Sequence, residues 1–137
     1  MSKDWVNDIS EMHAKFGVHV WMYENQAEQE KLNKFLEFRL KFLQEELGET
    51  IKAFENKDSE EIVDGLIDLC VVAIGTLDAF NVDAYKAWDE VHKANMTKEP
   101  GVKESRPNPL GLPDLIKPEG WTGPSHDGNH GDLPHSF

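Results

Sequence analysis

The feature that most constrains the fold is an apolar segment that carries acids but no base. Between Asp58 and Tyr85 there is no Lys or Arg, yet Glu61, Asp64 and Asp68 interrupt a run that is otherwise almost wholly apolar. At about 100° per residue these acids fall within about 60° of one another on a helix. The same sector holds small residues that let another helix approach: Gly65, Val72, Gly75 and Ala79. The other sides are apolar, so the sequence predicts a helix that is buried nearly all round.

A second acidic pair precedes this segment. Glu46 and Glu49 are three residues apart and share one face of a predicted long helix. The pair by itself is weak evidence for a metal site, because solvated helices often carry Glu-x-x-Glu. The second acidic helix strengthens this evidence. Buried carboxylates without cationic partners need a metal ion, and an all-oxygen site suits Mg²⁺ or Mn²⁺, which usually handle phosphates. The two segments together therefore predict a metal site, although Glu61 also fits the capping box of Asp58.

The hydrophobic periodicity predicts an all-α fold. Helices are expected over residues 4–15, 26–55, 58–80 and 83–98, with stops near Gly17, Asn56 and Asn81. From residue 99 onward the composition changes, because all seven prolines lie there. We therefore divide the chain into a helical domain, 1–98, and an extended tail, 99–137, rich in Pro and Gly. We expect the tail to pack over the helices or a neighbouring subunit through its apolar residues, Leu110, Leu112, Leu115, Ile116 and Trp121.

Charge and composition exclude several classes of partner. The net charge of −12 repels nucleic acid and anionic lipid, and the 14 Lys and Arg form no basic block. Cys70 has no partner for an intrachain disulfide, which fits a reducing compartment. The start of the chain lacks the pattern of a secretory signal, and acids interrupt the longest apolar region. We expect a soluble cytoplasmic protein that binds neither nucleic acid nor membrane.

Three further groups of residues have two interpretations each. Asn95 and Lys98 end the last predicted helix, where they either complement the helix dipole or contact phosphates. Phe42 lies with Phe38 beside the acids of the long helix, as plain core or as a wall that stacks on a nucleobase. The tail histidines have no predicted secondary structure to fix them, so a metal cluster there is disfavoured: His126, His130 and His135.

Taken together, these motifs resemble the MazG-like all-α nucleoside triphosphate pyrophosphohydrolases. The resemblance rests on Glu46-x-x-Glu49, Glu61-x-x-Asp64 and Asn95-x-x-Lys98, and covers roughly residues 13–98. The sequence around these motifs is similar to that of short, single-domain phage and bacterial members. The family implies a four-helix bundle that forms a homodimer or homotetramer. It also implies Mg²⁺, for which Mn²⁺ substitutes, and hydrolysis of a nucleoside or deoxynucleoside triphosphate to monophosphate and pyrophosphate.

The resemblance also assigns roles to residues. It implies that Glu46, Glu49, Glu61 and Asp64 are the metal ligands, and that Glu46 or Glu49 orients or deprotonates the attacking water. It implies that Asn95 and Lys98 position phosphate or sugar, and His13 lies where some relatives contact the base. A phage-encoded member would act in the cytoplasm of the host.

Asp68 lies one turn beyond Asp64 and has two candidate roles. A carboxylate accepts two hydrogen bonds, which suits the N1–H and exocyclic amino group of guanine. Some phage members of the family are directed to (d)GTP and supply dGMP for 2-aminoadenine DNA, which fits this role. The alternative is a further metal ligand or a group that orients one. The rival enzyme is phosphoribosyl-ATP pyrophosphohydrolase, which shares the fold and acidic motif, and the rival without activity is a helical interaction module.

Overall fold

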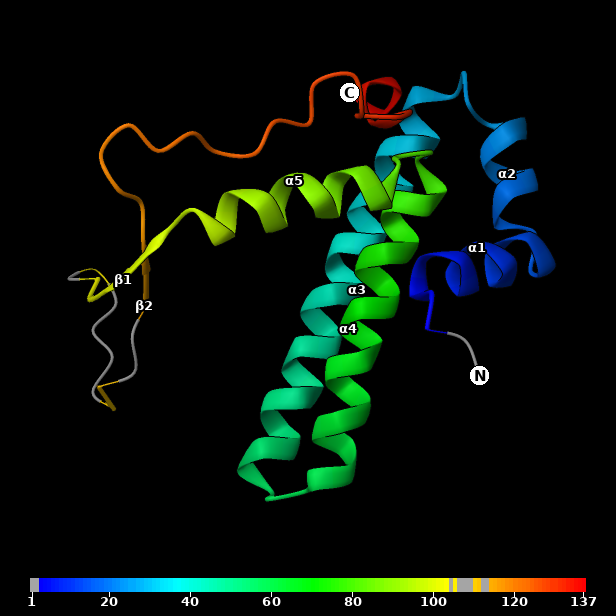
Figure 1. The fold of residues 1–137 in the computed structure, drawn as a ribbon. Helices are drawn as coiled ribbons and strands as arrows, with labels where there is room; N and C mark the ends of the chain where they lie inside the picture. Colours follow the sequence, from blue (N-terminus) through cyan, green and yellow to red (C-terminus); the bar gives the residue numbers. More distant parts are fainter. Residues whose placement is uncertain (1–2, 104, 106–109, 112–113) are drawn as a thin grey trace. The chain divides into compact units, whose positions relative to one another are not determined.

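The computed structural model describes residues 3–103, 105, 110–111 and 114–137. These residues form two compact units, one from Met1–Ala84 with His130–Phe137 and one from Tyr85–Asn129. The elements, in chain order, are α1 Trp5–Lys15, α2 Val18–Glu24, α3 Gln29–Glu55, α4 Ser59–Ala79, α5 Ala84–Met96, β1 Glu99–Gly101, β2 Asp114–Ile116 and the 3₁₀ helix η1 Leu133–Ser136 (Figure 1). The predicted all-α class is confirmed.

Local chemistry at the helix ends explains most of the boundaries. The Asp58 side chain accepts a hydrogen bond from the Glu61 backbone N–H at 3.1 Å, so the predicted cap of α4 is confirmed. The predicted stop at Asn56 is the C-cap of α3. Gly17 adopts φ of 82°, which only glycine adopts readily, and it ends α1 and begins α2. The short helix α2 was not predicted, and it makes five α-helices where four were expected.

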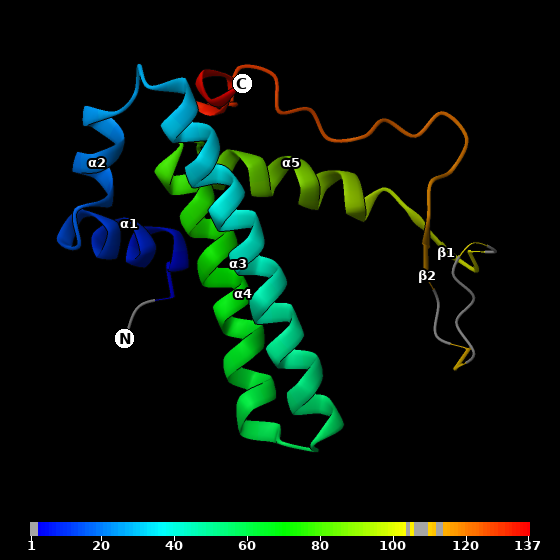
Figure 2. The ribbon, with the colours of Figure 1, turned by 180° about the vertical axis from the view of Figure 1, so that it is seen from behind.

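In the first unit, α3 and α4 form an antiparallel hairpin and run side by side over their length (Figures 1 and 2). The face of α4 that packs in the unit is the predicted small one, since its buried residues are Gly65, Val72, Gly75 and Ala79. A Cβ atom at Gly65 would overlap the Thr50 hydroxyl of α3. The close approach of the two helices therefore depends on glycine.

The prediction that α4 is buried nearly all round is wrong for a single chain. Val63, Leu66 and Ile67 are all exposed. The described elements that pack on α4 are α3, α1 and α2, and they leave its remaining side open. The periodicity of the sequence indicates that this side is apolar, but the described residues of the first unit leave it exposed.

The hydrophobic core lies at the end of the hairpin where α3 begins and α4 ends. Leu32 and Phe80 are fully buried there, and the Phe35 ring lies between Trp21 and Phe80, with centroids 5.3 and 5.8 Å away. The end of the chain joins this core, because Leu133 packs against it and Asn33 donates a 2.9 Å hydrogen bond to the Ser136 carbonyl. Residues 130–137 thus belong to the first unit.

The second unit is built on α5. β1 pairs with β2 in antiparallel register, Pro100 opposite Leu115. The Trp121 indole N–H donates to the Ala94 carbonyl at 3.0 Å and to the Thr97 hydroxyl at 2.9 Å, which docks this part of the tail on the end of α5. Of the other apolar tail residues, Leu110 and Leu115 are exposed, Ile116 is half-buried, and Leu112 lies outside the described residues.

Candidate active site

The α3–α4 hairpin brings carboxylates of the two helices together. Burial raises the pKa of Glu46, and the charges of Glu49, Asp68 and Asp64 raise it further. Such coupling requires short separations between α3 and α4. The structure therefore gathers these four predicted site residues, which we call the carboxylate cluster.

Asp68 lies within the carboxylate cluster, beside Asp64. Its pKa is raised first by burial and then by the charge of Asp64 and by a hydrogen bond between the two carboxyl groups. All of these effects disfavour the charged form of Asp68, so the ionised carboxylates of the cluster repel one another. A divalent cation relieves the same repulsion, and the oxygen donors suit Mg²⁺ or Mn²⁺. The donor types therefore suit the predicted ion, and its binding by the carboxylate cluster stays a prediction.

Glu61 is exposed in the first turn of α4, one turn before Asp64. Its backbone N–H donates to the Asp58 side chain, but the Asp58 N–H donates to the Ala53 carbonyl at 2.9 Å, so only the Asp58 half of the predicted capping box is observed. Its carboxylate as a metal ligand stays a prediction.

The aromatic wall lies one turn before the carboxylate cluster on α3. The rings of Phe38 and Phe42 meet nearly edge to face, with centroids 6.1 Å apart. Phe42 is half-buried and precedes Glu46 by four residues, so the two share a face of the helix. Its stacking on a nucleobase stays a prediction.

Asn95 and Lys98 belong to the second unit. The Lys98 ammonium lies 5.3 Å from the centre of the Trp121 ring, and the Lys117 ammonium lies 5.2 Å from the same ring. Trp121 therefore holds two cations by cation–π contacts. The phosphate contacts of Asn95 and Lys98 stay predictions.

A comparison with known families decides the class of the protein. The profile of the family described as phosphoribosyl-ATP pyrophosphohydrolase matches residues 15–95. The chain belongs to the phosphoribosyl-ATP pyrophosphohydrolase family. This family lies within the MazG-like all-α superfamily of nucleotide pyrophosphohydrolases, so the predicted class of enzyme is supported at that level. No curated protein matches the chain.

The family match spans all the acidic motifs and Asn95, but His13 and Lys98 lie outside it. Within one chain, the structure also separates His13 from the carboxylate cluster. Its Nδ1 lies 2.8 Å from Oδ2 of Asp78, and Asp78 is ten residues beyond Asp68 on α4, which is about 15 Å along the axis. A role of His13 in contacting the base stays a prediction.

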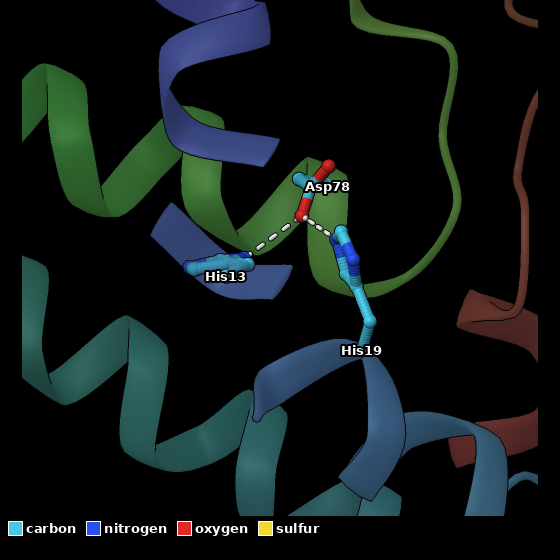
Figure 3. A group of neighbouring side chains, drawn as sticks. All are labelled: His13, His19 and Asp78. Carbon is cyan, nitrogen blue, oxygen red and sulfur yellow. Dashed lines mark hydrogen bonds and ion pairs between the residues drawn. The ribbon is translucent and has the colours of Figure 1, made fainter. Parts of the chain in front are cut away.

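The protein has a second polar group, which consists of His13, His19 and Asp78 (Figure 3). The Asp78 Oδ2 atom accepts hydrogen bonds from His13 Nδ1 at 2.8 Å and from His19 Nε2 at 2.7 Å. Sequence reasoning missed His19 and Asp78. Two signals were present, namely two histidines on either side of Gly17 and an acid near the apolar end of α4.

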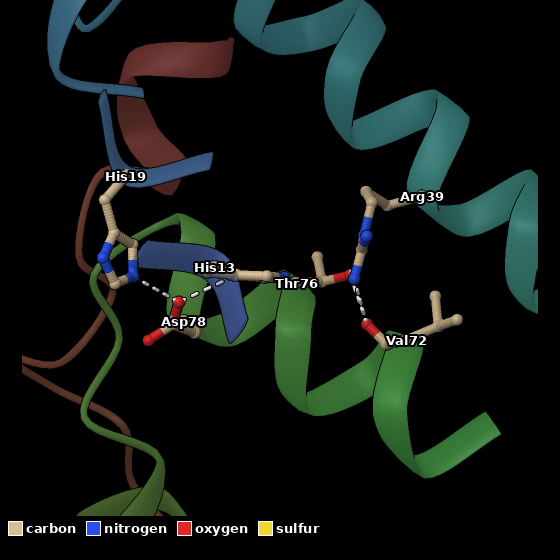
Figure 4. A network of polar contacts seen from close by, with 6 residues as sticks. All are labelled: His13, His19, Arg39, Val72, Thr76 and Asp78. Atoms are coloured by element: carbon tan, nitrogen blue, oxygen red, sulfur yellow. Dashed lines mark hydrogen bonds and ion pairs between the residues drawn. The ribbon is translucent and has the colours of Figure 1, made fainter. Parts of the chain in front are cut away.

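Arg39 of α3 lies next to this group (Figure 4). It donates to the Thr76 hydroxyl at 3.0 Å and to the Val72 carbonyl at 2.9 Å. Burial lowers the pKa of His13, and the charges of Arg39 and His19 lower it further against the opposing effect of Asp78. His13 is therefore neutral at neutral pH.

Within the described residues, no helix combines the length and the apolar character of a membrane span.

Proposed function

We propose that the protein hydrolyses nucleoside or deoxynucleoside triphosphates to monophosphate and pyrophosphate, with Mg²⁺ as cofactor. The observation that carries this proposal is the carboxylate cluster, where burial and then the acids of both helices raise the pKa of Glu46. The chain that carries this cluster belongs to a pyrophosphohydrolase family. In the reaction, the oxygen of water forms a bond to one of the two phosphorus atoms that share the α–β bridging oxygen. The bond between that phosphorus and the bridging oxygen breaks, which gives monophosphate and pyrophosphate.

In this proposal Glu46, Glu49, Glu61 and Asp64 hold the ion, and Mn²⁺ replaces Mg²⁺. The ion supplies positive charge that neutralises the triphosphate and the charge developing in the transition state. Glu46 or Glu49 accepts the proton of the attacking water, and burial together with the neighbouring acids raises the pKa of Glu46, which favours its acceptance of a proton. Asn95 and Lys98 position phosphate or sugar, and Phe42 stacks on the base.

For the base, we propose that Asp68 selects guanine, so that the substrate is GTP or dGTP. The charge of Asp64 and a hydrogen bond from it act on Asp68, so the Asp68 carboxyl group lies beside the proposed ligands. Asp68 is half-buried. Its oxygens suit two donors on one edge of guanine, whereas adenine offers one donor and one acceptor there. Supply of dGMP in a phage-infected cell is the role that this substrate fits. A contact of His13 with the base requires that another copy of the chain completes the site and that the buried His13 ring leaves Asp78.

A second candidate substrate is phosphoribosyl-ATP, because the matching family is described by that activity. The reaction is the same hydrolysis of a nucleotide triphosphate group, so the carboxylate cluster serves either substrate. The two candidates differ in the base and in the additional ribose phosphate.

We further propose that the working form is a homodimer or a homotetramer. The exposed apolar side of α4, with Val63, Leu66 and Ile67, favours burial against a second copy. Light scattering after size exclusion measures the mass directly, and a monomer at micromolar concentration contradicts this part of the proposal.

The test is a substrate panel. Purified protein is incubated with Mg²⁺ and each ribo- and deoxynucleoside triphosphate or phosphoribosyl-ATP, and monophosphate and pyrophosphate are separated by chromatography. Glu49→Gln is expected to abolish pyrophosphate release. Glu55→Gln makes the same charge change at the exposed end of α3 and is expected to leave the rate unchanged. Release that does not depend on metal, or that survives in Glu49→Gln, contradicts the proposal.

The selection of guanine has its own test. Asp68→Asn keeps the shape of the side chain but replaces one acceptor by a donor. The ratio of kcat/KM for dGTP over dATP is expected to fall by about tenfold or more, the cost of leaving donors of guanine unpaired. A variant with an unchanged ratio and a reduced rate for both nucleotides assigns Asp68 to the metal site instead.

A further inference from the structure

Three helices of the first unit bring two imidazoles and a carboxylate to one point. His13 comes from the end of α1, His19 from the start of α2, and Asp78 from the last turn of α4 (Figure 3). One ligand atom from each residue lies within 4.8 Å of the other two. We propose that His13, His19 and Asp78 form a binding site for one transition-metal ion of the Zn²⁺ class, separate from the carboxylate cluster.

The distances fit the exchange of two hydrogen bonds for a metal ion. The two imidazole nitrogens lie 2.8 and 2.7 Å from the same oxygen of Asp78. Around a tetrahedral zinc ion with bonds of about 2.0–2.1 Å, neighbouring ligand atoms are about 3.4 Å apart. Each nitrogen therefore needs to move away from that oxygen by less than about 1 Å, and the ion takes the place of the two protons.

The ligand types select the class of ion. Imidazole nitrogen suits Zn²⁺ and its neighbours in the first transition row, whereas Mg²⁺ prefers oxygen donors alone. Two histidines and one carboxylate are also the ligand number of a zinc site that keeps one position open. The carboxylate cluster, which has only oxygen donors, suits the other class of ion. The proposed site therefore differs from the carboxylate cluster in the class of ion that its ligands favour.

A polar pocket adjoins two of the proposed ligands. A pocket of about 390 Å³ lies beside His19 and Asp78, and Asp132 contributes a second carboxylate to its wall. The residues of its lining include no Lys or Arg. Side-chain exposure rises from 4% for His13 through 15% for Asp78 to 39% for His19, so a cation reaches the ligands from the side of His19. The two carboxylates of the lining attract a divalent ion, against the opposing charge of Arg39 beside His13.

The scaffold fixes two of the ligands before any ion binds. His13 packs so closely on α4 that a Cβ atom at Gly75 would lie 3.2 Å from its ring, and Arg39 packs against the same glycine. Asp78 is held within the last turn of α4, and the turn at Gly17 directs α2 back toward it. His19 is the most exposed ligand, so its replacement leaves the core intact.

The experiment is a titration of the full chain, stripped of metal, with ZnCl₂ in millimolar MgCl₂. Mg²⁺ occupies oxygen sites, so calorimetry and the shift of Tm report on the nitrogen ligands. We expect one equivalent of Zn²⁺ to bind and to raise Tm. His19→Ala is expected to weaken the binding by about 100-fold or more, since loss of a group that only orients a ligand already costs about 10–100-fold.

Two further variants control for folding and for the tail. Asp78→Asn keeps the volume of the side chain and is expected to fold and to bind Zn²⁺ more weakly. With Co²⁺ as the probe in place of Zn²⁺, the variant is expected to lose the absorption of the bound ion. His135→Ala removes a tail imidazole that lies 3.7 Å from Asp132 and is expected to bind Zn²⁺ like the wild type. Absence of Zn²⁺ binding, equal binding by His19→Ala and wild type, or loss of binding in His135→Ala overturns the proposal.

Discussion

A single methyl group at Gly65 tests the packing that brings the carboxylates together. Gly65 lies on α4 between Asp64 and Asp68, and an added Cβ atom would overlap the Thr50 hydroxyl and approach Thr50 Cβ at 3.1 Å. That hydroxyl donates a 2.7 Å hydrogen bond to the Glu46 carbonyl. Gly65→Ala must therefore rotate Thr50 or move α3 away from α4.

The magnitude follows from two opposing effects. Replacing glycine by alanine inside a helix stabilises by about 0.5–1 kcal/mol, whereas overpacking a tight contact costs about 1–3 kcal/mol. We expect Gly65→Ala to lower the free energy of unfolding by about 1 kcal/mol. Gly48→Ala is the matched control, because it lies within α3 and a Cβ atom there meets nothing within 4 Å. The control is expected to gain about 0.5–1 kcal/mol, and about 2 kcal/mol separates the two variants.

Urea unfolding followed by circular dichroism measures both variants at the same protein concentration. A difference of about 2 kcal/mol corresponds to roughly 8 °C in Tm for a domain of this size. Thr50→Ala removes the overlapping hydroxyl and should recover part of the loss in the double variant. Because the helices move apart beside the carboxylates, Gly65→Ala should also require more Mg²⁺ for half-maximal activity. If Gly65→Ala is as stable as Gly48→Ala, the close approach of α3 and α4 is refuted.

Two other predictions concern charge. Arg39→Met should lower the free energy of unfolding in urea by about 1–3 kcal/mol, because the half-buried guanidinium donates to two acceptors of α4. Lys41→Met on the exposed face should change it by no more than about 0.5 kcal/mol, and equal effects of the two variants contradict this reasoning. The pKa values of Glu46 and Asp68 lie above those of the unfolded chain, so without metal the folded state binds protons more tightly than the unfolded state does. The stability that this binding contributes at low pH is lost as the pH rises through the pKa values of the folded state. Mg²⁺ should therefore raise Tm more at about pH 8 than at about pH 5, relative to EDTA, and an equal gain at both pH values counts against metal binding by these acids.

The site was partly predictable because its pieces are close in the sequence. α3 and α4 are joined by a short turn, so they must lie antiparallel, and the small residues of α4 mark the face that meets α3. Acids on that face then meet Glu46 and Glu49. By contrast, α2 has only seven residues and depends on the backbone of Gly17, so its periodicity is too short to detect.

By itself the sequence determined the helical class, the capped start of α4 and the pairing of acidic faces, because these depend on spacing and local hydrogen bonds. Only the tertiary structure decided which polar residues meet across long separations. His13 and Asp78 are 65 positions apart and act on each other only because α1 folds back onto α4. It also decided which apolar face stays open, since Val63 and Leu66 carry the periodicity of buried residues but remain exposed among the described residues. Periodicity records the preference of a side chain for an apolar neighbour, and the neighbour itself is supplied by the packing of distant segments.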